Sequence, residues 1–337
     1  MAKIALNFED GITRFIETTG YETIAEAAYR EGINIPLDCA DGACGTCKCL
    51  SRSGTFDAGD YIEEALSDDE AAQGYGLACQ MRPESDMVVD ILASSAACKV
   101  EATTYQTTIT ALRFLSPEIV KLQVKTNDNS TIAFLPGQYA NILVPGSSET
   151  RSYSFSSLSN SDEMEFIIRL IPEIGLMSNY LRQAQVGDQL QITGPLGSFY
   201  NREINKPTLF FAGGTGIAPF IAMMEQLNVE NCSENIQLFY GATTTENVVE
   251  LERINNYEHL NVQTFACVSN QESTTFANGF VTQWINKETL NQPNYDIYIC
   301  GPNAMVDAVK QALEANQITF DNFYTEKFVP TGETAKA

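Results

Sequence analysis

Two periodicities in the pattern of hydrophobic and polar residues divide the chain into three stretches. In residues 1–98, Lys3–Phe8 alternates between apolar and polar positions, as a half-buried strand does, and Thr23–Arg30 carries apolar residues on one helical face. Met87–Leu92 has the pattern of a short apolar strand, and the small, polar run Ala93–Ala97 is typical of a linker. The stretch therefore predicts a small α+β domain over residues 1–98.

Strand patterns dominate the second stretch, residues 99–205, in which Gly, Pro, Asn and Asp separate the apolar runs. The expected strands are Thr107–Leu112, Val120–Lys125, Tyr139–Val144, Arg151–Ser156, Glu165–Leu170 and Gln189–Thr193. Short strands at this spacing predict a closed antiparallel β-barrel.

In the third stretch, residues 206–337, apolar strands alternate with helical patterns. The expected strands are Thr208–Ala212, Gln237–Tyr240, Val262–Cys267 and Asp296–Cys300. The expected helices are Pro219–Leu227, Val248–Ile254, Val281–Lys287 and Ala304–Glu314. This alternation predicts an α/β domain with a doubly wound parallel sheet.

Four cysteines mark the first domain. Cys39, Cys44 and Cys47 form a C-x4-C-x2-C segment, and 31 residues separate Cys47 from Cys79. This is the plant-type spacing of four thiolates around one [2Fe–2S] cluster, and the small residues of the loop leave backbone N–H groups free to point at the sulfurs. A four-cysteine zinc site is the alternative, but zinc sites usually use paired C-x2-C segments. Cys49 is expected to be a packed thiol rather than a ligand.

A glycine-rich loop opens the third domain. Gly213, Gly214, Thr215 and Gly216 follow an expected strand and precede an expected helix, whose N-terminus offers N–H donors and a partial positive charge. Such a loop suits a dinucleotide diphosphate, although Pro219 stands where a strict G-x-G-x-x-G motif has its third glycine. A plain tight turn is the alternative.

A second segment, Cys300-Gly301-Pro302, ends another expected strand of the third domain, and strand ends of such sheets line the ligand crevice. From the residues alone, Cys300 is expected to be a small core residue.

Two segments of the barrel carry groups that suit a phosphate-bearing ring compound. Arg151 offers a fork for phosphate, Tyr153 a flat ring and Ser154 a small hydroxyl donor. The segment Gly175-Leu176-Met177-Ser178 precedes an expected helix over Asn179–Gln183, whose N-terminus is a second candidate diphosphate site.

Charge and composition exclude some classes of function. The formal net charge of −23 argues against nucleic-acid binding, and no stretch approaches 18 apolar residues, so no membrane span is expected. Met1–Phe8 lacks the apolar run of a signal peptide, and nine cysteines are an odd number for a disulfide-bonded secreted protein, so a cytoplasmic protein is expected. Residues 1–98 hold 18 acidic and 6 basic residues, more than twice the net charge density of the remainder. The excess predicts a solvated acidic surface or a docking face for a basic redox partner.

The order of these motifs resembles that of the iron–sulfur flavoprotein reductases of bacterial aromatic-ring oxygenases, including those of benzoate-type dioxygenases. These proteins join a plant-type, β-grasp ferredoxin domain to a ferredoxin–NADP reductase-like module. The resemblance covers essentially the whole chain. It implies a [2Fe–2S] domain over residues 1–98, an FAD-binding barrel over 99–205 and an NAD-binding domain over 206–337.

The resemblance also implies roles for matching residues. Arg151 would bind flavin phosphate, Tyr153 and Ser154 would contact the isoalloxazine ring, and Cys300 would lie beside the position of hydride transfer. Cys300, Ser154 and Tyr153 are therefore expected to be catalytic. Further cofactor-binding residues implied in this way are Gly175, Met177 and Ser178 for FAD diphosphate, Gly213, Gly214, Thr215, Gly216, Gly301 and Pro302 for the nicotinamide nucleotide, and Phe328 against the flavin.

The implied function is electron transfer from NADH through FAD and the [2Fe–2S] cluster to a Rieske-type terminal oxygenase. NADH is favoured over NADPH because Gly241–Glu246, after the second strand of the third domain, contains no basic residue for a 2′-phosphate. Two alternatives stay open: the reductase of a multicomponent monooxygenase, and a zinc-stabilised scaffold without catalytic activity. His259, the single histidine, lies outside every motif and is expected on the surface.

Overall fold

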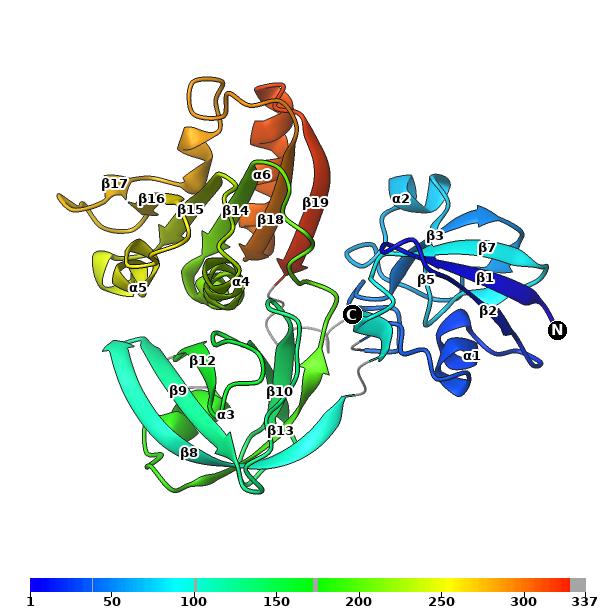
Figure 1. Cartoon of the computed structure of the whole chain (residues 1–337), viewed down its shortest axis with the longest axis horizontal. Coiled ribbons are helices and arrows are strands. Elements are labelled where there is room, and N and C mark those ends of the chain that lie inside the picture. Colours follow the sequence, from blue (N-terminus) through cyan, green and yellow to red (C-terminus); the bar gives the residue numbers. More distant parts are fainter. Residues whose placement is uncertain (38, 100–101, 172–174, 328–337) are drawn as a thin grey trace. The chain divides into compact units, whose positions relative to one another are not determined.

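The computed structural model describes residues 1–37, 39–99, 102–171 and 175–327 (Figure 1). The chain forms two compact units, Met1–Thr103 with Gly194–Ser198, and Thr104–Thr193 with Phe199–Ala337. The second unit contains both an antiparallel and a parallel sheet. The finer division at residues 98 and 205 stays a prediction.

The first unit is built on a mixed five-stranded sheet in the order β2-β1-β7-β3-β5, in which β1 and β7 are parallel. Its strands are β1 (Lys3–Phe8), β2 (Thr13–Glu17), β3 (Lys48–Ser53), β5 (Tyr75–Leu77) and β7 (Met87–Ile91), with a separate pair β4 (Phe56–Asp57) and β6 (Arg82–Pro83). Its helical segments are α1 (Ile24–Arg30), α2 (Asp68–Ala72) and the 3-10 turn η1 (Ala97–Lys99). Ile4, Leu6 and Phe8 are buried as their alternation predicts.

The expected linker at Ala93–Ala97 is wrong. Ala93 and Ser95 are buried, and the Ser95 hydroxyl and backbone N–H both donate to the Asp10 carboxylate, at 2.7 and 2.9 Å. The Ala93 carbonyl also accepts a hydrogen bond from the Glu9 backbone. Small residues at this point allow close packing on the first unit rather than freedom of movement.

All six expected barrel strands are confirmed. They are β8 (Thr103–Ser116), β9 (Ile119–Thr126), β10 (Tyr139–Leu143), β11 (Thr150–Ser154), β12 (Met164–Arg169) and β13 (Gln189–Leu196). The sheet order is β11-β10-β13-β8-β9-β12, and an antiparallel bridge between Phe155 and Phe166 links its two ends. The closed barrel surrounds a core that includes Phe134, Phe155 and Phe166.

The parallel sheet has the order β17-β16-β15-β14-β18-β19. Its strands are β14 (Thr208–Gly213), β15 (Ile236–Ala242), β16 (Val262–Val268), β17 (Ala277–Asn278), β18 (Tyr295–Gly301) and β19 (Phe320–Lys327). Its helical segments are η2 (Gly214–Gly216), α4 (Ile217–Val229), η3 (Thr245–Asn247), α5 (Leu251–Asn255), η4 (Val281–Trp284) and α6 (Asn303–Ala315). The strand order reverses between β14 and β18, which makes their carboxyl ends the expected ligand crevice of such a sheet.

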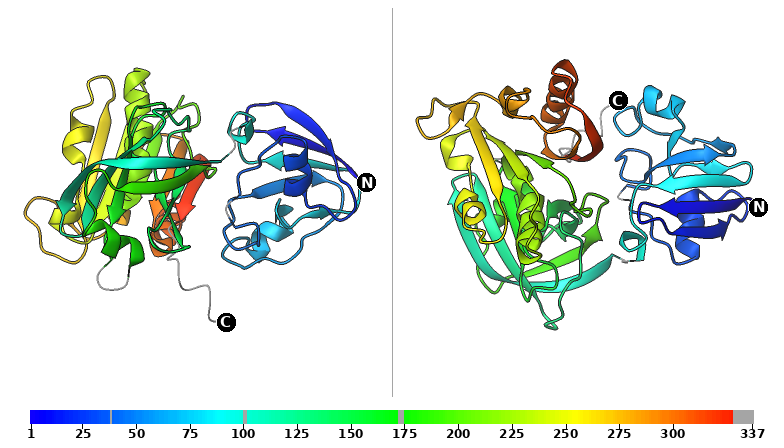
Figure 2. Two further views of the ribbon diagram at one scale, coloured as in Figure 1. Left: turned by 90° about the horizontal axis from the view of Figure 1, so that it is seen from below. Right: turned by 45° about the horizontal axis from the view of Figure 1, so that its top comes forward.

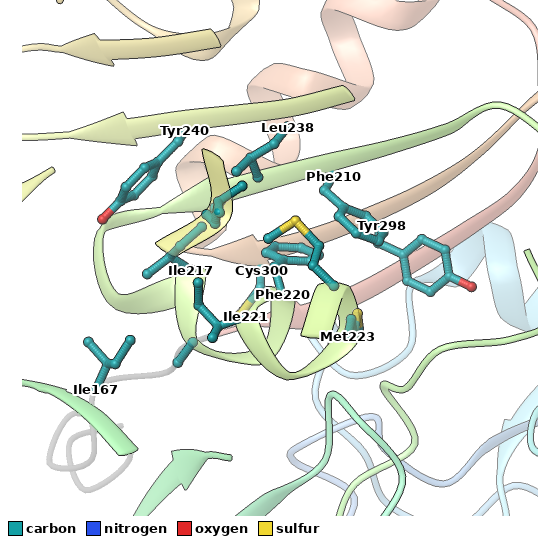
Figure 3. Close-up of a cluster of buried hydrophobic side chains, with 14 of the residues drawn as sticks. Ile167, Phe210, Ile217, Phe220, Ile221, Met223, Leu238, Tyr240, Tyr298 and Cys300 are labelled. Atoms are coloured by element: carbon teal, nitrogen blue, oxygen red, sulfur yellow. The ribbon is translucent and has the colours of Figure 1, made fainter. Parts of the chain in front are cut away.

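Alternate residues of β14 enter two different cores. Phe210 and Ala212 pack with α4, whereas Leu209 and Phe211 pack with α6, so helices cover both faces of the sheet (Figure 2). We call the buried cluster around α4 the α4 core; it contains Phe220, Tyr298 and Cys300 (Figure 3). It also includes Ile119 and Ile167 of the barrel. The barrel and the parallel sheet therefore share buried apolar surface within the second unit.

Two expected helices of the third domain differ from the structure. Val281–Lys287 contains only the 3-10 turn η4, which still buries Val281 and Ile285 as a helical face would. Val248–Ile254 is replaced by the short α5, which begins after Glu250, a residue with a left-handed φ of 65°. The strands β17 and β19 were not expected from the sequence.

Candidate functional site

The cysteine loop of the first unit is packed tightly against a second segment. A Cβ atom on Gly42 would lie 2.3 Å from the Asp60 carbonyl oxygen, and one on Gly45 would lie 3.0 Å from that of Ala65. Both glycines also have positive φ, 84° and 75°, which L side chains rarely adopt. Glycine is thus required here to turn the loop and to seat it against Asp60–Ala65.

The surroundings of the four predicted ligands shift the pKa values of three of them, Cys39, Cys47 and Cys79. Burial and the hydrogen bonds to Asp41 and Cys44 raise the pKa of Cys39 to about 11. The interaction with Cys79 and burial raise the pKa of Cys47, whereas the interaction with Cys47 lowers the pKa of Cys79 to about 6.

The backbone of the cysteine loop favours two of the thiolates. Backbone N–H groups of Asp41 and Ala43 act to lower the pKa of Cys39, against its net rise, and that of Gly42 acts to lower the pKa of Cys79. Donors of this kind stabilise thiolates, and a [2Fe–2S] cluster takes four of them, so this donor set fits the cluster. Within the described residues, no three His, Cys, Asp or Glu side chains are grouped around one point as for a single ion.

Two neighbours of the cysteine loop have separate roles. Cys49 is fully buried beside Met81, with the two sulfur atoms 3.3 Å apart, and burial raises its pKa to about 12. It is therefore a packed thiol, as expected. Sequence reasoning missed Gln80, whose side-chain amide donates to the Ala40 carbonyl at 3.2 Å and lies 3.9 Å from the Cys79 sulfur. Its only sequence signal is its place next to Cys79.

In the barrel, Arg151, Tyr153 and Ser154 lie on β11, opposite Ile142, Ala140 and Tyr139 of β10. The Arg151 guanidinium contacts the Glu149 carboxylate at 2.9 Å and the Thr150 carbonyl at 2.7 Å. Tyr153 and Arg151 share a strand face because side chains alternate, and burial raises the pKa of Tyr153. A guanidinium and a flat ring on one face fit a flavin with its phosphates.

In the second barrel segment, Gly175–Ser178, the helix begins three residues before its expected start. The helix is α3 (Leu176–Leu181) rather than Asn179–Gln183, and Gly175 is its N-cap residue. Met177 and Ser178 are buried in its first turn, where the Ser178 hydroxyl accepts a hydrogen bond from the Ile171 N–H at 2.9 Å. A Cβ on Gly175 would lie 2.8 Å from the Ser178 hydroxyl oxygen, so glycine permits this turn.

At the nucleotide end, three glycines lie so close to other residues that a side chain would not fit. A Cβ on Gly216 would lie 2.2 Å from the Cys300 carbonyl oxygen, and one on Gly301 would lie 2.7 Å from the Met305 side chain. Gly213 is similarly close to Pro302 and Met305. These contacts draw the loop after β14 onto the end of β18. Gly214 differs, since its φ is 55° and no atom lies within 4 Å of its Cβ position, which fits a cradle for a diphosphate.

The structure brings Cys300, Gly301 and Pro302 to the switch between β14 and β18. Cys300 is fully buried in the α4 core, as its residue type alone predicts, and burial raises the pKa of its thiol. Two residues of this end were not predicted: Met305 covers Gly213 and Gly301, and Asn303 has a buried amide oxygen that accepts no hydrogen bond within the described part of the chain. Phe328 lies outside the described residues.

Three family models cover most of the chain. The model of the 2Fe-2S iron-sulfur cluster binding domain matches residues 7–84, that of the oxidoreductase FAD-binding domain matches 106–200, and that of the oxidoreductase NAD-binding domain matches 210–311. The predicted cofactors and three-part fold class are thereby confirmed.

Full-length relatives decide the family. The toluate 1,2-dioxygenase electron transfer component of Pseudomonas putida is 48% identical over 330 residues, which cover 97% of this chain and 98% of that protein. The chain belongs to the iron–sulfur flavoprotein reductases of bacterial aromatic-ring oxygenases. Another member of this family, the 2-halobenzoate 1,2-dioxygenase electron transfer component of Burkholderia cepacia, is 42% identical over 97% of the chain and 98% of its own length.

A solved structure is similar to this chain over almost the whole length of both. The cytochrome P450 reductase GcoB of Amycolatopsis has a TM-score of 0.72 and 27% identity, over 97% of this chain and 99% of its own. No helix within the described residues is long and apolar enough to span a membrane. His259 is exposed, as expected.

Proposed function

We propose that this reductase passes electrons from NADH to the Rieske-type terminal component of a benzoate-type, aromatic-ring dioxygenase in the cytoplasm. The observation that carries the proposal is the full-length identity of 48% to a toluate dioxygenase electron transfer component. The free state of all nine cysteines suits a reducing compartment.

The residues of the chain would position three redox groups. When bound, FAD can exchange electrons in pairs or singly, and the cluster exchanges one at a time. Arg151, Tyr153 and Ser154 would hold and orient the flavin, with Gly175, Met177 and Ser178 at its diphosphate. Cys39, Cys44, Cys47 and Cys79 would bind the cluster. No acid–base side chain is needed for this role, and the single histidine is exposed.

The glycine loop would bind the nicotinamide nucleotide. Gly213, Gly214, Thr215 and Gly216 would face its diphosphate, with Gly301 and Pro302 beside the nicotinamide and Phe328 against the flavin. Cys300 is proposed to act there through the backbone end of β18, since its side chain is buried. Glu246 after β15 is exposed, and a carboxylate there disfavours the 2′-phosphate of NADPH.

The matched 2Fe-2S model favours the cluster over the zinc-stabilised scaffold. The test compares wild type with Cys44→Ser, using protein loaded with flavin and iron. Wild type should reduce cytochrome c with NADH. Cys44→Ser should lose that activity while NADH still bleaches its flavin, because the residues proposed to bind FAD and the nucleotide belong to the other unit.

Cys232→Ser, which changes a thiol of the parallel-sheet layer outside the proposed sites, is the matched control and should keep both activities. Wild-type protein that contains flavin and iron but cannot oxidise NADH would overturn the proposal. Turnover with a dioxygenase and a monooxygenase component then decides the partner class, and preference for the monooxygenase would refute the dioxygenase assignment.

A further inference from the structure

The loop that follows β15 is tied to the barrel by one buried amide. Asn247 is 6% exposed, and the Ser116 hydroxyl of β8 donates to its side-chain oxygen at 2.7 Å. Its side-chain nitrogen donates to the Glu118 carboxylate at 3.0 Å and to the Thr243 hydroxyl at 3.2 Å. The Asn247 side chain, which belongs to the parallel-sheet part of the second unit, thus forms hydrogen bonds with two residues of the barrel and one of its own loop.

The backbone of Asn247 closes the same loop from inside. Its N–H donates to the Thr244 carbonyl at 3.1 Å, and its carbonyl accepts from the Tyr240 hydroxyl at 3.2 Å. Tyr240 is fully buried in the α4 core, so this anchor is part of the sheet packing. The Thr243–Asn247 turn is therefore fixed on one side by β15 and on the other by the barrel.

The position of this turn in the sheet gives it a role toward the nucleotide. Gly213 and Gly241 are register partners on neighbouring parallel strands, so the turn starts at the same sheet edge as the glycine loop. In doubly wound sheets, ligands bind outside the carboxyl ends of the strands, and a residue of the segment that follows the glycine-loop helix meets the adenosine ribose. The three threonines of this turn are half-buried, and Glu246 is exposed.

We propose that Asn247 is a positioning residue for nicotinamide-nucleotide binding, through which Ser116 and Glu118 of the barrel hold the turn that meets the adenosine ribose. The inference rests on the proposed function. It adds that residues of the barrel influence the affinity for the nicotinamide nucleotide, which binds at the parallel sheet. A side chain that only stabilised the fold would lower resistance to unfolding but leave nucleotide affinity and the preference for NADH unchanged.

The test uses flavin-loaded protein with Ser116→Ala and Asn247→Ala. Dissociation constants for ADP-ribose are measured by calorimetry, and KM and kcat by NADH oxidation with ferricyanide. Loss of a buried hydrogen bond at this turn should raise both the dissociation constant and KM, roughly tenfold for Asn247→Ala. The kcat at saturating NADH should change less than about twofold, since the nicotinamide end is untouched.

Thr108→Ala is the matched control. Its hydroxyl also belongs to β8 and donates to an asparagine side-chain oxygen, that of Asn127, at 2.6 Å. This pair lies outside the turn, so nucleotide affinity should stay at the wild-type value.

A polarity swap separates positioning from general loss of stability. Asn247→Asp alone places a second carboxylate 3.0 Å from that of Glu118 and should weaken ADP-ribose binding. In the double variant with Glu118→Gln, the new amide at position 118 can donate to the new carboxylate at position 247. The hydrogen bond is then restored with donor and acceptor exchanged, and most of the ADP-ribose affinity should return. Unchanged ADP-ribose affinity in folded Ser116→Ala and Asn247→Ala would overturn the inference. A wild-type protein that neither binds ADP-ribose nor oxidises NADH would instead refute the proposed function.

Discussion

Single residues at the nucleotide end show how little space separates two loops. Gly216 has an ordinary φ of −61°, so its conformation alone would accept a side chain. It is the Cys300 carbonyl oxygen, 2.2 Å from the point that a Cβ atom would occupy, that excludes one. The requirement for glycine is thus a contact between residues far apart in the sequence.

Gly216→Ala is therefore expected to destabilise the second unit by about 1–3 kcal/mol, because a backbone carbonyl must shift to make room. Gly241→Ala is the control, since the nearest atom to its Cβ position is a methyl group of Val281 at 3.2 Å. It should cost less than about 1 kcal/mol. Urea unfolding followed by circular dichroism measures both changes, and equal losses would contradict the steric account.

At the scale of elements, an ion cluster joins the barrel to the nucleotide layer within the second unit. Arg253 of α5 contacts Glu165 of β12 at 2.6 Å and Glu225 of α4 at 2.8 Å. Lys121 of β9 contacts Glu250 at 2.7 Å, next to the start of α5. The side chains of Glu165 and Glu250 are only 9% and 8% exposed, so both depend on these cations.

Replacing Arg253 by Ala should cost about 3–5 kcal/mol of unfolding free energy, because two buried carboxylates then share one lysine. Arg169→Ala removes an exposed contact with Glu118 at 3.5 Å and should cost at most about 1 kcal/mol. The difference is read from urea unfolding of the two variants. A loss for Arg253→Ala no greater than that for Arg169→Ala would show that the ion cluster contributes nothing net.

The elements also show which features the sequence could predict. Most of the predicted strands have a clear apolar pattern because burial is extensive: β12, β14 and β18 are buried on both faces, and buried positions alternate along much of β9. The edge strand β19 begins with exposed residues from Phe320 to Asn322, so its pattern is weak. Val281 and Ile285 have helical spacing, but a 3-10 turn satisfies the same burial.

The candidate sites also contain features that a local sequence pattern can predict and features that it cannot. Cysteine spacing, the Arg151 segment and the glycine loop are local patterns, and they identify cofactors from a few neighbouring residues. The contact between Gly216 and Cys300 and the bond between Ser116 and Asn247 join residues 84 and 131 positions apart. No local pattern records such pairs, so only the fold reveals them.

For the whole molecule, the central claim is that one chain accepts electrons in pairs at its nucleotide end and releases them singly from its cysteine loop. The three matched family models and the full-length relatives place all the required domains in one polypeptide. A protein of this kind must store an odd number of electrons when fully reduced, because a flavin holds two and a [2Fe–2S] cluster holds one.

The most direct measurement is an anaerobic titration of the fully loaded protein with NADH, followed by its visible spectrum. Wild type is expected to take up about three electrons per chain, from about 1.5 NADH, and Cys44→Ser about two. Wild-type protein with two irons and one flavin that stops at about two electrons, with its iron–sulfur absorption unchanged, would contradict the account.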